Sequence, residues 1–506
     1  MYAACQFVAT ILRNMTHVIN KLRFEVECPH EDYAFSMRQN FAQTYQLQIA
    51  EIIDRVCNKY VSDNEWIRIG ELEIDLGLLS PSVFDREFEK IFLDDFEKKL
   101  LQKLGDYSIG QRKASEQKSK FELLQFFLQK GMLPWWGDET TTNLEELTEE
   151  VFSQSGEEIS RFLHHKKDDK LLWRRIAFQF SAKIKQEVIE LFKELSGAVA
   201  ILEAIKQNLS DEIKILQSGN LVVVENAVNK VKEKCEGIII VDMVIANAPI
   251  VFNEDGNFGE IKDIFHASIM DPLRSSLVQY GSMNSLWEEI VNGLLPSTIK
   301  SNQAMIQSSD DTGTPVVVNE NKDVTEYEAL FSNNDAAETD IGKIIVRNAG
   351  IILLAPFFKQ FFTTLGLLKG NDWMNTAAQV KAVYLLKYVS SGPGKHYEYH
   401  LVLEKLLCGM PVYMPIPQAP ELSKEEINEA DSLLRSVIEH WKVLKNTTIN
   451  ALRESFLKRD GIITARDNNW QLQIERKTMD VLLGSIPWGY ATISLPWNQY
   501  IIFTEW

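Results

Sequence analysis

Two spacings of apolar residues organise the first part of the chain. Residues 22–28 alternate apolar and polar side chains, which is typical of a half-buried strand. Residues 41–56 then place apolar side chains three and four positions apart, which predicts one face of a long helix. Alternation returns at 72–76, with acidic residues on the opposite face. The pattern predicts a β–α–β unit.

Helical spacing continues through the middle of the chain. Residues 82–104 and 121–130 show it, and Gly131 followed by Pro134 predicts where the second of these helices ends. From 143 to 217 the pattern predicts several amphipathic helices. The middle region is therefore expected to be helical.

A polar segment interrupts this pattern late in the chain. Residues 300–340 are rich in Ser, Asn, Asp and Thr and contain few large apolar side chains, which predicts a linker. Helical patterns follow it, and residues 470–503 alternate as a small antiparallel sheet would. We therefore predict an α+β, predominantly helical fold. Its expected parts are an N-terminal extension (1–16), a β–α–β unit plus helix (17–110), a helical middle region (111–299), the polar linker (300–340) and a C-terminal helical body with the small sheet (341–506).

Composition narrows the class of protein. The chain has 506 residues, 45% of them apolar, so it is expected to fold into two to four domains. Its formal charge of −18 disfavours binding to nucleic acid and to anionic membranes. Five cysteines without a Cys-x-x-Cys pair indicate reduced core thiols. Because the first charge, Arg13, follows the early apolar residues, no secretory signal is predicted.

Few residues suggest chemistry. The motifs of phosphate-binding loops, dinucleotide-binding turns, acyl-transfer elbows and zinc-protease helices are absent, so we predict no enzyme, no catalytic residue and no cofactor. His396, His400 and Glu404 have the spacing of metal ligands on a helix, but a surface helix is favoured over a metal site. The mixed charges of 164–175 favour a solvated helix end over a phosphate site. The most apolar stretch, 350–358, is far shorter than the about twenty residues that a membrane-spanning helix needs.

Tryptophans are the most distinctive residues. An indole offers a large apolar face and one N–H donor, so it suits a packed core, a docking surface or a sugar-binding platform. Core and docking roles are favoured, because sugar platforms are usual in secreted proteins. The residues expected in the structural core are Trp135, Trp136, Trp488 and Trp497. Trp506 is less easily enclosed on all sides and is the expected docking contact.

Several longer stretches resemble a known family. The C-terminal body resembles the tape measure proteins of bacterial contractile injection systems, which are phage-tail-like particles. The matching stretches are RNAGIILLAPFFKQFFTTLGLL (347–368), LVLEKLLCGMPV (401–412), VIEHWKVLKNTTINALRESFLKRDG (437–461), VLLGSIPWGYATISLPW (481–497) and the final EW (505–506). Two N-terminal stretches agree more weakly, LEIDLG (72–77) and FFLQKGMLPWW (126–136).

The resemblance implies a structural protein without enzymatic activity. Such a protein lies inside the tube of the particle and helps fix the length of tube and sheath. It implies partners among the inner tube and the spike, baseplate or cap proteins, with assembly in the bacterial cytoplasm and no membrane insertion. A fully helical chain of this length would reach about 760 Å.

The chain nevertheless lacks sustained heptads and has strands and proline breaks. We therefore expect the C-terminal body to be a folded anchor, with the linker and helical middle supplying variable length. Two alternatives stay open. One is a baseplate or cap adaptor of the same particle. The other is a cytosolic carbohydrate- or peptide-binding protein that uses the Trp-rich end.

Overall fold

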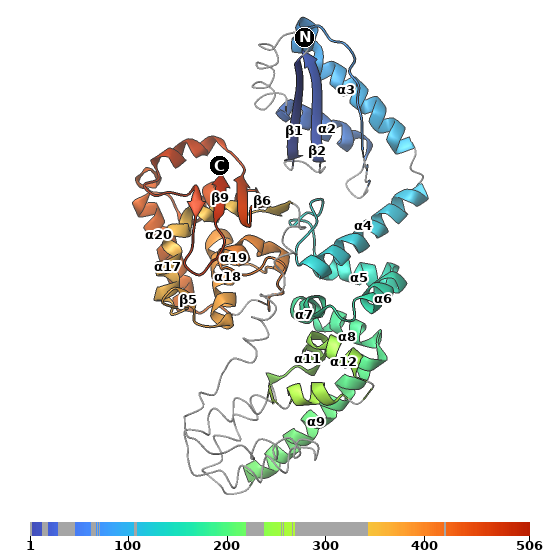
Figure 1. The fold of residues 1–506 in the computed structure, drawn as a ribbon, viewed down its shortest axis with the longest axis vertical. Helices are drawn as coiled ribbons and strands as arrows, with labels where there is room; N and C mark the ends of the chain where they lie inside the picture. The colour runs from blue at the N-terminus through green and yellow to red at the C-terminus, as the bar shows by residue number, and fades with distance from the viewer. Residues whose placement is uncertain are drawn as a thin grey trace. The chain divides into compact units, whose positions relative to one another are not determined.

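The computed structural model divides the chain into two compact units. The smaller unit comprises residues 1–127 and 133–159, and the larger comprises 128–132 and 160–506 (Figure 1). The structure describes residues 3–12, 19–28, 46–61, 67, 69, 71–105, 109–218, 237–254, 256, 258–265, 267–268, 343–418 and 421–506. The expected linker, 300–340, lies outside these residues.

The smaller unit combines a β-hairpin with helices. Strands β1 (Ala3–Leu12) and β2 (Ile19–Cys28) pair antiparallel, with Ala3 opposite Cys28. The helices are α2 (Gln46–Tyr60), α3 (Pro81–Gly105), α4 (Ile109–Lys130) and α5 (Leu144–Gln154), and the last residues of α4 belong to the larger unit. One core is formed by α2 and α3, through Ile49, Ile52 and Val56 on α2 and Phe88, Phe92 and Phe96 on α3.

The predicted β–α–β unit is not supported. β2 covers the first expected strand and α2 covers part of the expected helix, but β2 pairs with β1, and residues 71–80 form no strand. The side chains of 72–76 still alternate in burial, because Leu72, Ile74 and Leu76 pack against the α2–α3 core while the acidic residues between them are exposed. A period of two reports an extended segment with one buried face, and helices can cover that face as well as a sheet can.

The larger unit contains a cluster of helices, of which the first, α6, starts in the smaller unit. These are α6 (Gly156–His165), α7 (Lys170–Gln179), α8 (Ala182–Glu190), α9 (Lys193–Ser218), α11 (Ile240–Ala246) and α12 (Ala248–Asn253). Helix α11 packs against α7, α8 and α9. Trp173 of α7 lies at the centre, with its ring 5.7 Å from Phe192 and 5.3 Å from Phe252. The helical character predicted for the middle region is confirmed in its described parts, within 111–218 and 237–268.

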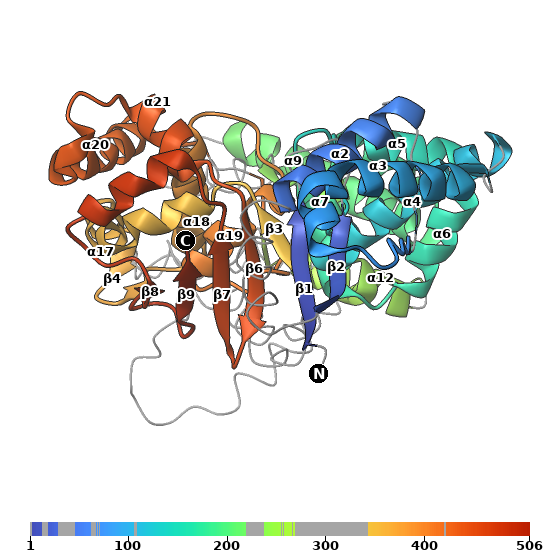
Figure 2. The same ribbon diagram turned by 90° about the horizontal axis from the view of Figure 1, so that it is seen from above.

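A mixed five-stranded sheet follows in the same unit. Its order is β3-β6-β7-β9-β8, built from β3 (Ile344–Val346), β6 (Gly461–Arg466), β7 (Asn469–Ile474), β8 (Thr492–Ile493) and β9 (Ile502–Glu505). Figure 2 shows β6, β7 and β9 side by side. The expected antiparallel sheet is wrong in one respect, because β7 and β9 run parallel. The chain returns to β9 through a long connection, which parallel pairing requires and a tight hairpin cannot provide.

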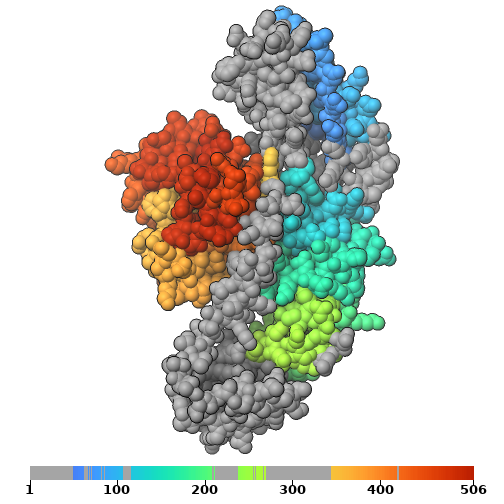
Figure 3. Space-filling model, in the orientation of Figure 1, coloured from blue at the N-terminus to red at the C-terminus, as the bar shows by residue number. Residues whose placement is uncertain are grey.

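Helices make up most of the rest of this body. They are η3 (Ala349–Leu354), α17 (Ala355–Thr364), α18 (Thr376–Ser391), η4 (Glu398–His400), α19 (Val402–Leu407), α20 (Lys424–His440), η5 (Lys442–Leu444), α21 (Ile449–Leu452), η6 (Arg453–Leu457) and η7 (Thr478–Ser485). A short hairpin, β4 (Leu368–Lys369) with β5 (Asp372–Trp373), lies between α17 and α18. In Figure 3 the residues from 343 onward pack as one continuous body.

Candidate functional site

Helix α7 carries the first half of a buried polar cluster. The Asp169 side chain caps the helix by accepting from the Leu172 backbone N–H at 3.1 Å, which satisfies one of the free donors of the first turn. Apolar residues such as Trp173 bury one side of the helix. Arg175 and Gln179 lie four positions apart and so share a face, and both are buried.

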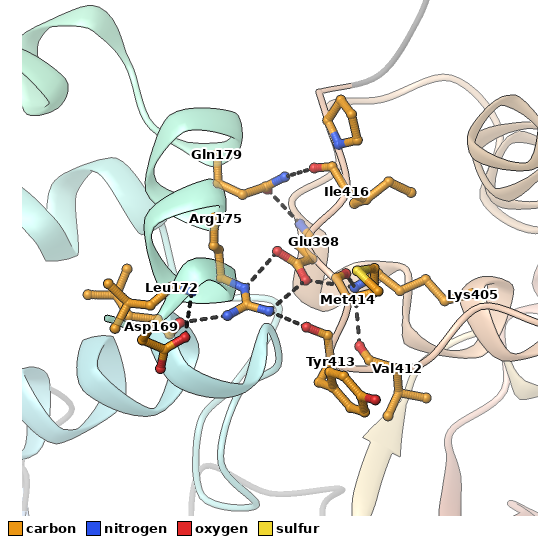
Figure 4. A network of polar contacts seen from close by, with 12 residues as sticks. Asp169, Leu172, Arg175, Gln179, Glu398, Lys405, Val412, Tyr413, Met414 and Ile416 are labelled. Atoms are coloured by element: carbon orange, nitrogen blue, oxygen red, sulfur yellow. Dashed lines mark hydrogen bonds and ion pairs between the residues drawn. The ribbon is translucent and has the colours of Figure 1, made fainter. Parts of the chain in front are cut away.

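Helices η4 and α19 carry the other half. Glu398 begins η4 and Lys405 lies in the middle of α19, and each has an exposed fraction of 0%. The chain after α19 turns back, so the backbone carbonyls of Val412 and Met414 face Lys405 (Figure 4). Segments that are far apart in the sequence thus meet at one point.

One carboxylate pairs with two cations at this point. Arg175 binds Glu398 in a bidentate manner, with Nε 2.9 Å from Oε2 and Nη2 3.3 Å from Oε1. The Lys405 ammonium donates to Glu398 Oε1 at 2.7 Å. The three side chains carry one positive charge in excess when all are ionised.

Backbone carbonyls accept the remaining N–H donors. Arg175 Nη1 donates to the Leu128 carbonyl at 2.6 Å, and Nη2 donates to that of Tyr413 (Figure 4). Lys405 donates to the carbonyls of Met414 at 2.7 Å and Val412 at 3.2 Å. These carbonyl dipoles partly offset the excess positive charge.

Gln179 completes the cluster. Its side-chain oxygen accepts from the Glu398 backbone N–H at 2.9 Å, and its nitrogen donates to the Ile416 carbonyl at 2.7 Å. We call Arg175, Gln179, Glu398 and Lys405 the Arg175 cluster. It joins four segments of the larger unit, namely residues 128–132, α7, the η4–α19 pair and 412–416.

Burial dominates the electrostatics of the cluster. Loss of water lowers the pKa of Lys405 to about 8, although the neighbouring Glu398 carboxylate opposes that shift. Removing one member of such a buried pair typically costs about 3–5 kcal/mol, whereas replacing all members by apolar groups is often neutral. The cluster therefore specifies which segments meet more than it adds net stability.

A glycine makes room for the carboxylate. Gly131 follows α4, and its backbone adopts φ +73°, which side chains with a Cβ rarely do. A Cβ at this position would overlap the Glu398 carboxylate. The same residue thus ends α4, as the sequence predicts, and allows the backbone to approach the Arg175 cluster.

A second buried cluster lies beside the first. Glu404, which precedes Lys405 on α19, accepts from the Asn348 side chain and lies 3.7 Å from the Lys387 ammonium. Asn348 also donates to Ser390 Oγ at 3.1 Å. Burial raises the pKa of Glu404. We call Asn348, Lys387, Ser390 and Glu404 the Glu404 cluster.

Indole N–H groups satisfy the carbonyls that the end of α19 leaves free. Trp497 donates to the Leu407 carbonyl at 2.9 Å and Trp373 donates to that of Cys408 at 3.0 Å. The two rings lie 5.1 Å apart. Trp488 acts similarly, donating to the Leu353 carbonyl at 2.9 Å, with its ring 5.0 Å from Phe357.

The other tryptophans of interest are half-buried, as Trp488 and Trp497 are. Trp506 is partly buried, and its indole donates to Asp480 Oδ2 at 3.0 Å. The Arg459 guanidinium lies 5.9 Å from its ring. Trp135 and Trp136 are partly buried in the smaller unit.

Sequence reasoning missed both clusters. The solvated helix end expected at 164–175 is wrong for Arg175, which is fully buried, and the surface helix expected around 396–406 is wrong because Glu398 and Glu404 are fully buried. The sequence held one kind of signal, a charged residue among apolar ones. Lys405 lies in the apolar run 401–408, and Arg175 lies among the apolar residues of 171–178. A charge on an apolar face needs a partner, but its spacing alone does not identify that partner.

The residues considered as metal ligands do not form a site. His400 Nδ1 accepts from the Tyr397 backbone N–H at 3.0 Å, and Glu404 belongs to its own cluster. Burial lowers the pKa of His396 to about 4. Among the residues that the structure describes, no three His, Cys, Asp or Glu side chains are placed to hold a metal ion. No helix in the described ranges is long and apolar enough to cross a membrane.

Buried ionic clusters and indole donors thus hold distant segments of the larger unit in one body. A family model described as contractile injection system tape measure protein matches residues 16–506. The chain therefore belongs to the contractile injection system tape measure protein family and is a structural component of such a particle. No curated protein and no solved structure matches it.

Proposed function

We propose that the protein helps set the length of the tube and sheath from within the particle, with the larger unit as its anchor. The family supports this role. The Arg175 cluster supports the anchor, because bidentate and fully buried contacts between α7 and Glu398 fix the geometry of that unit. A ruler needs one end held in a defined place, and a body with fixed geometry provides it.

The anchor we propose is larger than the C-terminal body. Helices α7, α8, α9, α11 and α12 pack on one another and belong to the same compact unit as residues from 344 onward. Helical residues enclosed in this way are poorly suited to extension. We therefore place the variable length in the polar segment 300–340, on the basis of its composition.

An insertion series tests this role. Both flanks of 300–340 belong to the larger unit, so an insert can extend only as a doubled-back loop. Polar segments of increasing length inserted there should lengthen particles by at most about half the rise of a helix, about 1.5 Å per residue, or of an extended chain, about 3.3 Å per residue. The matched control places the same inserts at Asp467–Asn468, the exposed turn between β6 and β7. Electron microscopy of the particles should show length steps only in the first series.

One observation favours a second function, that of a baseplate or cap adaptor. The longest helix that the structure describes is α9, with 26 residues, and the helices around it pack back on one another. A compact body fits an adaptor better than it fits a rod. Particles of constant length in both insertion series would support the adaptor and contradict the ruler.

The partners we propose are the inner tube and the spike, baseplate or cap proteins, with assembly in the bacterial cytoplasm and without nucleic acid or membrane insertion.

We propose Trp506 as a docking contact and Trp135, Trp136, Trp488 and Trp497 as structural residues. Trp497→Ala should lower the melting temperature clearly, because the half-buried indole packs against Phe362 and Trp373 and its loss also frees a helix carbonyl. Trp506→Ala should melt closer to the parent yet yield fewer full particles. If Trp506→Ala melts like the parent and assembles normally, Trp506 is not a docking contact.

A further inference from the structure

Exposed apolar side chains gather on two adjacent short helices of the larger unit. The large apolar residues exposed in the described part of this unit are Ile239, Met374, Val443, Met479 and Val481. Val443 belongs to η5, and Met479 and Val481 belong to η7, which packs against η5. Val481 is 81% exposed. We call the exposed faces of η5 and η7 the η5–η7 surface.

Hydrogen bonds at both ends hold this surface rigid. The buried indole of Trp441, just before η5, donates to Ser485 Oγ at 2.9 Å at the end of η7. At the start of η7, Asp480 accepts from Arg459 at 2.8 Å and from Trp506 at 3.0 Å. A surface that is already ordered loses little conformational entropy when a partner binds. Exposed apolar side chains that are held rigidly are therefore more typical of a binding surface than of a flexible loop.

The border of the surface is basic. Its exposed cations are Lys442, Lys445, Arg476 and Lys477. Two acidic residues lie next to these cations in the sequence, Glu439 before η5 and Glu475 before η7. Glu475 is paired with Lys477 at 3.0 Å. Asp480 is held by Arg459 and adds little outward negative charge. Excess positive charge is notable in a chain whose formal charge is −18.

We propose that the η5–η7 surface binds an acidic amphipathic segment of another component of the particle. Apolar residues of that segment would cover Met479, Val481 and Val443, and its Asp and Glu side chains would pair with the basic border. A second copy of this chain fits poorly, because the same basic border would face itself. The inference rests on family membership for the particle, but not on any role in setting length.

Substitution on the surface is the first test. The double variant Met479→Asp with Val481→Asp should melt like the parent and reduce the amount of the protein per particle at least tenfold. Lys442→Glu with Lys445→Glu should reduce incorporation in the same direction. Met374→Asp is the control and should incorporate normally, because Met374 is about as exposed as Met479 and belongs to the same unit. Normal incorporation of both surface variants would overturn the proposal.

Crosslinking identifies the chemistry of the partner. A photoreactive amino acid at position 481 of the full chain, activated in purified particles, should give adducts whose partner peptide has apolar residues and more Asp and Glu than Lys and Arg. Adducts to a basic or uncharged segment, or to a second copy of this chain, would overturn the proposal. Both measurements are independent of particle length, so they can succeed even if the insertion series shows no ruler.

Discussion

Two neighbouring residues of α19 enter two different buried clusters. Lys405 joins the Arg175 cluster, in which both oxygens of Glu398 accept charged N–H donors. Glu404 joins the Glu404 cluster, in which its Oε1 accepts from Asn348 but its Oε2 has no partner among the described residues. Both carboxylates have exposed fractions of 0%.

The difference shows that partners, not burial, decide what a buried carboxylate contributes. Glu398 receives a guanidinium and an ammonium in direct contact, so its charge is compensated. Glu404 has one cation at 3.7 Å, and burial raises its pKa. Removing the carboxylate charge should therefore lower the free energy of unfolding strongly at Glu398 and only slightly at Glu404.

The largest expected effect comes from Glu398→Gln. This change leaves two buried cations without a carboxylate, and we expect the free energy of unfolding of the larger unit to fall by about 3–5 kcal/mol. Denaturant unfolding of the full chain, followed by tryptophan fluorescence, measures it. A loss below about 1 kcal/mol would show that the carbonyl groups alone compensate the two cations.

Gly131→Ala should have the next largest effect. The new Cβ requires a strained φ and displaces the Glu398 carboxylate, so we expect a loss of about 2–3 kcal/mol. Gly366→Ala is the matched control, because Gly366 has φ +68° but open space around it. If both variants lose the same stability, the backbone strain acts alone and the approach to Glu398 is unimportant.

The pH dependence should show the lowered pKa of Lys405. Between about pH 8 and 10.5 the folded protein has released this proton while the unfolded chain still binds it, so stability should rise with pH in that window. Lys405→Met should lack this contribution. The difference in unfolding free energy between parent and variant, measured across the window, checks it, and a parent that weakens relative to Lys405→Met would contradict the assignment.

The smallest effect is expected for Glu404→Gln. Glutamine has the shape of a protonated glutamic acid, and the raised pKa of Glu404 favours that form, so stability should change by less than about 1 kcal/mol. The same unfolding experiment as for Glu398→Gln gives a direct comparison. Equal losses for the two variants would remove the distinction between the clusters.

Local patterns determined several elements from the sequence. Gly131 ends α4 as predicted, because glycine tolerates the positive φ that ends a helix. The alternation at 72–76 predicted which side chains turn inward, although no strand formed there. The family resemblance was also carried by the residues themselves and is confirmed over 16–506.

Tertiary structure decided what these patterns leave open. Arg175 and Glu398 are separated by 223 positions, and no periodicity links them. Likewise, β9 pairs parallel to β7 because of the path that the chain takes between them. Spacing reports which face of an element is apolar, whereas the partner of a buried charge depends on which distant segment packs against that face.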